Sequence, residues 1–428
     1  MKAKESFQVG APMELIDKTK VLTMICRALN MVDHRLVNHG LKVALVMQDM
    51  LKAEGRLNIQ YRKKLETMAL LHDIGAYRER EIDHILQVET KNVWEHAIHG
   101  YLFLRSYFPD DDAAKIVLYH HAKYNEVWNG ENKEILRYAQ MMHIADRICV
   151  WHDAVKKTKE EFMQYLGTKV GTDFSPEDAV LFQKADKIYK TWEKLDQEPV
   201  LGQLTDCLEI SQKEAEDYLY ILVDSIDFRS RTTAVHTRSV MEISLEIARL
   251  VGLPVGMQKK IYYGALMHDL GKIGIPVSIL EKPGRLTEDE MDIMRKHIIL
   301  GELIISDCVD EEVAQIALRH HEKINGEGYP LGLSGKDLTL PQRLLAVADV
   351  LSALCMARSY KEAFAKERCL SILQDMAEKN QIDKELVALV VKEFDFIIET
   401  ATKRCEPIEN RYIQMQIDFK KLISYYIL

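Results

Sequence analysis

Metal-binding side chains recur in the second half of the chain in numbers that one metal ion would not need. They are five histidines and two aspartates: His236, His268, Asp269, His297, His320, His321 and Asp349. Imidazole and carboxylate ligands together suit iron, manganese, zinc or nickel rather than calcium or a thiolate cluster. One catalytic metal usually takes three or four protein ligands. Seven candidates therefore predict two divalent metal ions that share a bridging carboxylate.

The first half of the chain carries the same residue types in the same order. The candidates for a second metal site there are His39, His72, Asp73, His96, His120, His121 and Asp146. A glycine also follows the lone histidine of each half by four residues, as Gly100 after His96 and Gly301 after His297. On a helix this spacing lets a neighbouring helix approach closely. Such a matched series indicates an internal repeat.

The elements that must position these side chains are predicted to be helices. The chain has only ten prolines and twenty glycines in 428 residues, and its periodic runs are rich in Leu, Met, Glu and Lys, which favours an all-α fold. The runs that carry the candidates are 13–53, 61–71, 92–104, 134–153, 236–250, 259–272, 289–304, 311–323 and 341–354. Breaks near GTDFSPED and DQEPVLG predict two tandem domains, 1–195 and 196–428.

Composition narrows the class of partner and the compartment. A net charge of −9 argues against a surface that coats a nucleic acid polymer. No apolar run approaches the ~20 residues of a membrane span, and the first residues have no apolar signal core. Seven scattered cysteines without a CxxC pair favour reduced thiols. We expect a cytoplasmic protein that binds neither membrane nor nucleic acid polymer, and a homodimer stays open.

Isolated signals of the same kind carry little weight. A third HD dipeptide, His152–Asp153, has no partners in phase, and we interpret it as surface or packing. Lone histidines such as His99 and His143 are more often ordinary core or surface residues than ligands.

The second half resembles the HD-GYP family, a branch of the HD phosphohydrolase superfamily. The resemblance rests on HDLGKIGIP, KPGRLTEDE, the lone His297 with Gly301, HHEKINGEGYP and ADVLSALCMARSYK. The first half resembles a general HD domain, because it has all the ligand positions but no GYP segment. The fold that this resemblance implies is a pair of tandem HD-type helical domains.

The resemblance implies a cyclic dinucleotide phosphodiesterase that uses iron or manganese, with nickel or zinc as alternatives. Family members chiefly hydrolyse cyclic di-GMP, and some open the 3′,3′-cyclic GMP-AMP ring. The seven candidates of the second half match the family's metal ligands, and Asp269 matches the bridging carboxylate. Lys272 matches the lysine that contacts the scissile phosphate. Substrate-contacting positions are matched by Tyr329, Arg358 and Lys361.

Three positions depart from the family's pattern. Some members have a glutamate that supports a third metal where this chain has Thr232, so we expect two metals. Asn325 replaces the usual aspartate before the GYP segment, and Ser359 replaces the usual proline of an RPY sequence.

Phosphodiester hydrolysis explains why these groups are needed. Two cations ~3.5–4 Å apart can accept phosphate oxygens, and coordination lowers the pKa of a water from 15.7 towards ~7. Lys272 could neutralise charge that builds on the phosphate. Gly326 and Gly328 would allow the tight turn of the GYP segment, which Pro330 stiffens. Without the surrounding motif, Lys272 would be interpreted as a solvated lysine.

Two alternatives to a cyclic dinucleotide phosphodiesterase stay open. One is a general HD nucleotide phosphohydrolase, and the other is a nucleotide-binding signalling module without turnover. In the first half, Ala76 replaces the equivalent of Lys272, and AKYNEVWNG replaces the GYP segment. That half could be a scaffold or sensor, or an active phosphomonoesterase of the 5′-nucleotidase kind.

Overall fold

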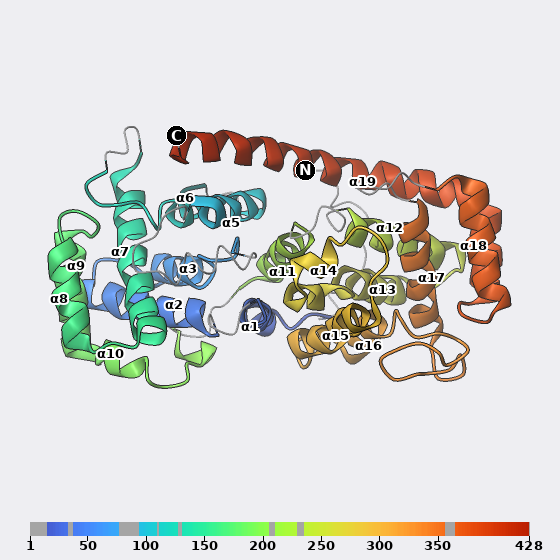
Figure 1. Cartoon of the computed structure of the whole chain (residues 1–428), viewed down its shortest axis with the longest axis horizontal. Coiled ribbons are helices and arrows are strands. Elements are labelled where there is room, and N and C mark those ends of the chain that lie inside the picture. The colour runs from blue at the N-terminus through green and yellow to red at the C-terminus, as the bar shows by residue number, and fades with distance from the viewer. Residues whose placement is uncertain are drawn as a thin grey trace. The chain divides into compact units, whose positions relative to one another are not determined.

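The computed structural model is helical wherever its described residues form regular structure, which confirms the all-α prediction (Figure 1). Among these residues, β-pairing is limited to three isolated bridges. No described helix is long and apolar enough to cross a membrane. The residues described are 15–32, 37–76, 94–108, 111–126, 131–204, 210–228, 235–355 and 364–427.

The helices follow one another with short connections. Those before residue 228 are η1 (Lys18–Lys20), α1 (Val21–Asn30), α2 (His39–Glu54), α3 (Ile59–Leu70), α5 (Trp94–Tyr107), α6 (Asp111–Leu118), α7 (Lys133–Val150), the π-helix η3 (Trp151–Val155), α8 (Lys159–Lys169), α9 (Pro176–Tyr189), α10 (Thr191–Lys194), η4 (Leu201–Gln203) and α11 (Gln212–Asp227). Those after it are α12 (His236–Leu250), α13 (Val255–Met267), η5 (Leu270–Gly274), α14 (Val277–Leu280), α15 (Glu288–Ile305), α16 (Glu311–Leu318), α17 (Leu340–Cys355), α18 (Lys366–Glu378) and α19 (Lys384–Ile427).

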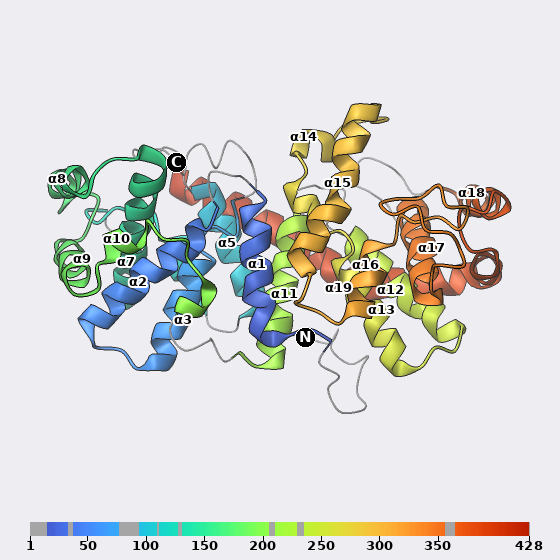
Figure 2. The same cartoon turned by 90° about the horizontal axis from the view of Figure 1, so that it is seen from below.

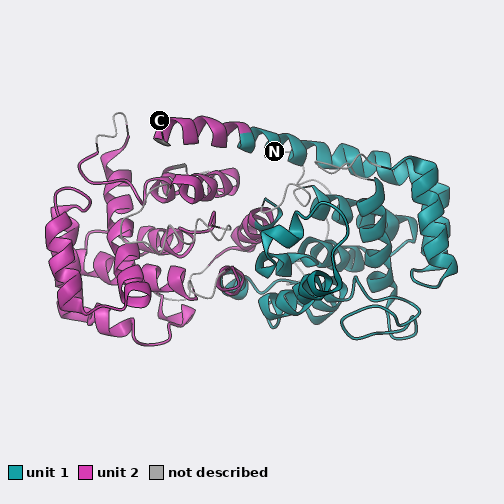
Figure 3. Cartoon of the chain, in the orientation of Figure 1, with its two compact units in different colours: residues 1–24, 226–416 teal, residues 25–225, 417–428 magenta. Residues whose placement is uncertain are grey.

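The chain forms two compact units, and each contains one of the two sets of candidate ligands (Figure 3). Unit 1 comprises residues 1–24 and 226–416, and unit 2 comprises residues 25–225 and 417–428. Each unit thus includes a segment from the opposite end of the chain. The division at 225/226 lies within the domain that we predict to begin at residue 196, and those domain limits stay a prediction.

Unit 1 builds its core from α12, α13, α15, α16 and α17. Capping residues set the starts of two of these helices. Thr287 and Glu290 form a capping box at the start of α15, where each side chain accepts a hydrogen bond from the other's backbone N–H. Asp310 accepts from two backbone N–H groups at the start of α16. The KPGRLTEDE sequence therefore fixes where the helix that carries His297 begins.

Unit 2 corrects the prediction of one continuous helix over residues 13–53. The segment is divided into η1, α1 and α2, and α2 begins at His39. Asn38 precedes it in a left-handed conformation with φ of 61°, which asparagine tolerates better than most residues. Its backbone N–H donates to Asn30 Oδ1 at 2.8 Å, and Asn30 Nδ2 donates to Asn38 Oδ1 at 3.0 Å. This break places His39 at a helix start.

The last residues of α19 belong to unit 2 and pack on its aromatic side chains. Phe419 stacks on His99 with ring centroids 4.1 Å apart. Tyr426 stacks on Trp94 at 4.4 Å and donates a hydrogen bond to the Tyr119 hydroxyl at 2.9 Å. His99 is accordingly a packed core residue, as expected of a lone histidine.

Candidate metal centres

Helix ends position most of the candidate ligands of unit 1. His236 is the first residue of α12, His268 follows the last residue of α13, and Asp269 precedes η5. The remaining ligands lie inside or just after a helix: His297 in α15, His320 and His321 after α16, and Asp349 in α17. All seven come from five helices that pack in one core (Figure 2).

Asp269 lies at the centre of these seven side chains, which we call the C-terminal centre. Its Oδ2 is 3.1 Å from His268 Nε2 and 3.9 Å from His236 Nε2. Its Oδ1 is 3.6 Å from His297 Nε2 and 4.0 Å from His320 Nε2. The second aspartate, Asp349, lies 3.0 Å from His236 Nε2. The two oxygens of Asp269 therefore face different histidines, as a bridging carboxylate requires.

The histidine rings are held in the orientation that a metal needs. The Nδ1 atoms of His268, His297 and His320 each donate to the backbone carbonyl three residues earlier, at 2.7 Å. This leaves each Nε2 as an acceptor. The Nε2 atoms of His297 and His320 are buried and have no hydrogen-bond partner. A buried polar atom without a partner is costly, and outer hydrogen bonds of this kind are typical of metal-binding histidines. The residues thus fit a metal.

The charges of the C-terminal centre suit divalent cations at neutral pH. Burial lowers the pKa of His321 to about 3, and it also lowers the pKa values of His297 and His320, so these rings are neutral. Burial opposes ionisation of Asp349, but the hydrogen bond from His236 outweighs it and holds the pKa well below the usual value. Neutral imidazoles and ionised carboxylates are the forms that bind metals.

Glycine is required where η5 meets α15. A Cβ on Gly271 would collide with the backbone carbonyl of His297 and the backbone nitrogen of Gly301. The close approach that we predict at Gly301 is therefore real, but the tighter constraint lies at Gly271 and involves η5 rather than a neighbouring helix. Gly75 and Gly100 show the same arrangement in unit 2.

Two predicted substrate-contacting residues border the C-terminal centre. Lys272 Nζ lies 2.5 Å from Asp269 Oδ2. The Tyr329 ring lies 4.8 Å from the His321 ring, and the Arg295 guanidinium lies over its face at 5.7 Å. Arg358 and Lys361 lie outside the described residues, as does Thr232.

The GYP segment is held in place by a residue that sequence reasoning missed. The buried Glu322 carboxylate accepts hydrogen bonds from the backbone N–H groups of Leu331 at 2.7 Å and Leu333 at 2.9 Å. Gly326 has φ of 79°, and a Cβ on Gly328 would collide with the backbone of residues 321–323. The signal was the glutamate of HHEK, since the first half has Ala122 at that position.

Unit 2 gathers its seven candidates in the same way, and we call this set the N-terminal centre. Asp73 Oδ2 lies 3.2 Å from His72 Nε2, and Asp73 Oδ1 lies 3.5 Å from His96 Nε2. Asp146 Oδ1 lies 3.1 Å from His39 Nε2. The three-residue groups whose ligand atoms lie within 4.8 Å of one another include His96, His120 and His121, and also His39, His72 and Asp146.

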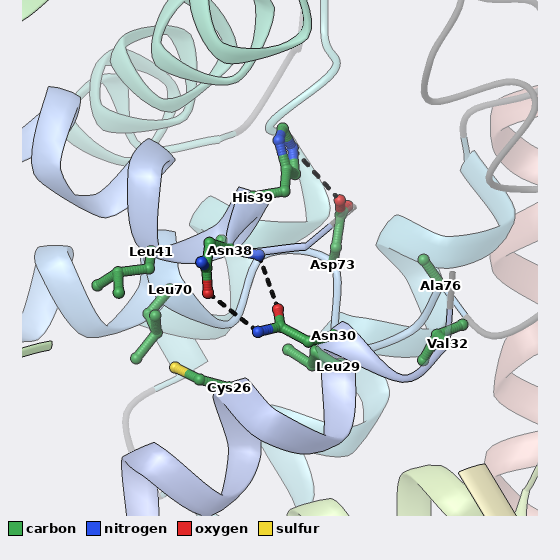
Figure 4. Close-up of a pocket in the computed structure, with 11 residues that line it drawn as sticks. Cys26, Leu29, Asn30, Val32, Asn38, His39, Leu41, Leu70, Asp73 and Ala76 are labelled. Atoms are coloured by element: carbon green, nitrogen blue, oxygen red, sulfur yellow. Dashed lines mark hydrogen bonds and ion pairs between the residues drawn. The ribbon is translucent and has the colours of Figure 1, made fainter. Parts of the chain in front are cut away.

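The N-terminal centre differs from the C-terminal centre beside its bridging aspartate. Ala76 replaces the equivalent of Lys272, and a small pocket of about 30 Å³ lies there (Figure 4). By its volume it has room for about two water molecules. The residues that line it include Cys26, Asn30, Asn38, His39, Asp73 and Ala76. Access to Asp73 in unit 2 is thus not filled by a lysine.

The third HD dipeptide is part of a packing network, as predicted. His152 lies 2.7 Å from Asp153 through Nδ1 and 3.0 Å from Asp196 through Nε2. Lys42 donates to both oxygens of Asp153, at 2.8 and 2.9 Å. These contacts satisfy both ring nitrogens of His152 and leave it no role as a ligand in either centre.

Two family models match the chain, both described as HD domain, over residues 36–151 and 221–386. Each match contains one complete set of seven candidates. The chain belongs to the HD-domain family. It carries two HD domains in tandem, which confirms the predicted fold and the resemblance to HD-GYP proteins.

Similar proteins are named as cyclic dinucleotide phosphodiesterases. The chain is 26% identical over 394 residues to 3′3′-cGAMP-specific phosphodiesterase 1 of Vibrio cholerae, which covers 86% of this chain and 90% of that protein. It is 40% identical over 168 residues to the cyclic di-GMP phosphodiesterase response regulator RpfG of Xanthomonas campestris, covering 39% of this chain and 44% of that one. The chain thus spans less than half of this second relative.

A solved structure shares the fold over most of the chain. A crystal structure described as a cyclic GMP-AMP specific phosphodiesterase of V. cholerae matches with a TM-score of 0.56 and 18% identity, over 89% of this chain and 98% of that chain. At this identity the likeness shows the tandem HD fold alone.

Proposed function

We propose that the protein is a metal-dependent phosphodiesterase that hydrolyses a cyclic dinucleotide at its C-terminal centre. The substrate is cyclic di-GMP or 3′,3′-cyclic GMP-AMP, and the products are the linear dinucleotide or mononucleotides. The observation that carries the proposal is the pair of unpartnered, buried Nε2 atoms of His297 and His320, which face a shared carboxylate beside Lys272. The family and the names of the similar proteins support it.

The proposed metals are two divalent cations, iron or manganese by preference and nickel or zinc as alternatives. The residues that would hold them are His236, His268, Asp269, His297, His320, His321 and Asp349. When bound, the metals supply positive charge for the phosphate and lower the pKa of a bound water. The backbone hydrogen bonds to the imidazole rings pre-orient these ligands, so that little reorganisation is needed on binding.

Lys272 is proposed to act on the phosphate. Its ammonium group is paired with Asp269 in this structure, and its side chain is only 19% exposed. Because it is attached by a flexible four-carbon stem, it can turn from the carboxylate to a phosphate oxygen. In that position it would stabilise negative charge that develops in the transition state.

Tyr329 is proposed to hold a base of the substrate. Its ring borders His321, and Glu322 fixes the loop that follows it. A tyrosine face is suited to stacking on a nucleobase, and such stacking tolerates either purine. Arg358 and Lys361 are proposed to contact phosphate or base edges.

The direct experiment is a panel of cyclic dinucleotides offered to the protein loaded with Fe(II) or Mn(II), with the products resolved by mass. We expect turnover of one or both of the proposed substrates by the wild type. Asp269→Ala should abolish turnover and lower the metal content, because that carboxylate faces ligands of both metals. Retained turnover in Asp269→Ala would contradict the proposal.

The same panel separates the two alternative functions. A general HD nucleotide phosphohydrolase would turn over mononucleotides and leave the cyclic dinucleotides intact. A signalling module would bind a nucleotide tightly without turnover under reducing conditions. Either result would replace the proposed function.

The N-terminal domain is proposed to be a scaffold or sensor, or a 5′-nucleotidase that removes the terminal phosphate of the linear product. The pocket beside Asp73 favours access by a small ligand. Phosphate release from a linear dinucleotide that His72→Ala abolishes, but His268→Ala does not, would establish the nucleotidase. No release by the wild type would exclude it.

A further inference from the structure

The two centres place their cations on different aspartates. In the C-terminal centre, Lys272 pairs with Asp269, the aspartate at the centre of the ligand set. In the N-terminal centre, the ion-pair partners of Asp73 among the described residues are histidines only. The cation there is Arg147, which donates to Asp146 Oδ2 from Nε at 3.0 Å and from Nη2 at 2.6 Å.

The internal repeat supplies a direct comparison for this arginine. Asp349 is the counterpart of Asp146, and Val350 follows it where Arg147 follows Asp146. Within the described part of the chain, the ion pair recorded for Asp349 is with His236. The second aspartate thus carries a guanidinium in one centre and an aliphatic neighbour in the other.

Arg147 differs from Lys272 in how far it can move. The Arg147 side chain is 4% exposed, and two of its N–H groups bond one carboxylate oxygen. The Lys272 side chain is 19% exposed and makes its contact through one flexible ammonium group. Lys272 can leave its aspartate when metal or substrate arrives, whereas Arg147 stays beside Asp146.

A fixed cation at Asp146 opposes a metal at the same carboxylate. Asp146 Oδ1 faces His39 Nε2 at 3.1 Å, and these two atoms form a three-ligand group with His72. A metal there would share a carboxylate with a guanidinium in a buried site, where repulsion between like charges is weakly screened. A hydrogen bond from Arg147 also orients Asp146, but the two-plus charge of the metal makes repulsion the larger effect.

We propose that Arg147 makes the two metal centres unequal. The N-terminal centre binds one metal well at His96, His120, His121 and Asp73, and binds a second metal weakly at His39, His72 and Asp146. The C-terminal centre binds both of its metals well. This inference deepens the proposed function, since it rests on the two ligand sets being metal sites. At limiting metal, the phosphodiesterase centre fills completely while the N-terminal centre holds a single ion.

The test counts manganese in chains that retain one centre. Asp269→Ala leaves the N-terminal centre, and Asp73→Ala leaves the C-terminal centre. Each chain is equilibrated with increasing free Mn(II), and bound metal is measured by elemental analysis. We expect Asp269→Ala to bind one ion tightly and a second with a dissociation constant at least tenfold higher. We expect Asp73→Ala to bind two ions within a narrower range. Two equally tight ions in Asp269→Ala, or none, would overturn the inference.

Matched substitutions separate the charge of Arg147 from its volume. In the Asp269→Ala chain, Arg147→Met should tighten the second ion at least tenfold, whereas Arg147→Lys should leave it weak. In the Asp73→Ala chain, Val350→Arg should weaken the second ion, which tests the same charge without removing a buried arginine. Equal behaviour of Arg147→Met and Arg147→Lys, or no effect of Val350→Arg, would contradict the inference.

The proposed function is judged from a separate readout. It fails if the Asp73→Ala chain, loaded with two ions, does not turn over any cyclic dinucleotide. The inference about Arg147 is judged from metal binding by the Asp269→Ala chain, in which no phosphodiesterase turnover is expected.

Discussion

At the scale of single residues, the two centres share ligands and differ in the groups beside them. The histidines and aspartates occupy equivalent positions in both HD domains, and both centres bury them. Lys272, Glu322 and Tyr329 belong to unit 1, where the matching positions examined in unit 2 hold Ala76 and Ala122. Different chemistry in the two domains therefore follows from the neighbours of the ligands rather than from the ligands.

Lys272 provides the first prediction at this scale. Lys272→Met should lower kcat for the cyclic dinucleotide by about 10²–10³, the usual cost of removing one group that stabilises transition-state charge. Metal content should stay at the wild-type value, because the lysine is not a ligand. Steady-state kinetics and elemental analysis of the same preparation check both parts. Loss of metal with loss of activity would instead assign Lys272 a structural role.

His152 provides a prediction about pH and stability. The hydrogen bond to Asp153 raises the pKa of His152 in the folded protein, and burial opposes this. The stabilisation is therefore complete below the unfolded pKa of about 6.5 and is lost as pH rises through the higher folded pKa. His152→Gln should lower the unfolding free energy by about 0.5 kcal/mol at pH 5.5, and the difference should vanish at pH 9.

Denaturant unfolding at the two pH values measures this effect. Lys42→Met is the control, because the pair between Lys42 and Asp153 stays charged at both pH values and its loss should cost a similar amount at each. An equal loss of stability for His152→Gln at pH 5.5 and pH 9 would show that the imidazole acts through packing alone.

At the scale of elements, short connections place the chemistry as much as the helices do. The η5 turn presses Gly271 against α15, and the segment after His321 is tied back by Glu322. A helix pattern in the sequence could predict where ligands lie along each helix. It could not predict the close approach at Gly271 or the break at Asn38, because both depend on contacts between separate segments.

The tie between Glu322 and the GYP segment gives a prediction at this scale. Glu322→Gln should raise KM for the cyclic dinucleotide about tenfold, because replacing a charged acceptor of two backbone N–H groups loosens the loop that carries Tyr329. Metal content should be unchanged, since the ligands keep their own hydrogen bonds. The matched control is Glu327→Gln on the exposed part of the same segment. Equal KM values for the two variants would contradict this role of Glu322.

At the scale of the whole molecule, each compact unit uses a segment from the far end of the chain. The order of ligands along the sequence was sufficient to predict tandem HD domains and both sets of seven residues. The placement of residues 417–428 in unit 2 was not predictable, because it depends on stacking of Phe419 on His99 and of Tyr426 on Trp94. No local pattern in the sequence records those partners.

Truncation after Gln416 tests the part that the chain end plays in unit 2. The shortened chain should lose about 2–4 kcal/mol of unit 2 stability, because it loses two stacked aromatic side chains. Tyr426→Phe should lose only about 1 kcal/mol, since it removes one hydrogen bond and keeps the stacking. Proteolysis with identification of the cleaved sites measures which unit opens. Unchanged protection of unit 2 in the truncated chain would exclude this role.

The central claim is that side chains from five helices of unit 1 hold two metal ions around Asp269. Anomalous X-ray diffraction from crystals loaded with Mn(II) tests it most directly. The account predicts two anomalous peaks ~3.5–4 Å apart, bridged by Asp269 and contacted by His236, His268, His297, His320, His321 and Asp349. A loaded crystal with no anomalous peak among these residues would contradict it.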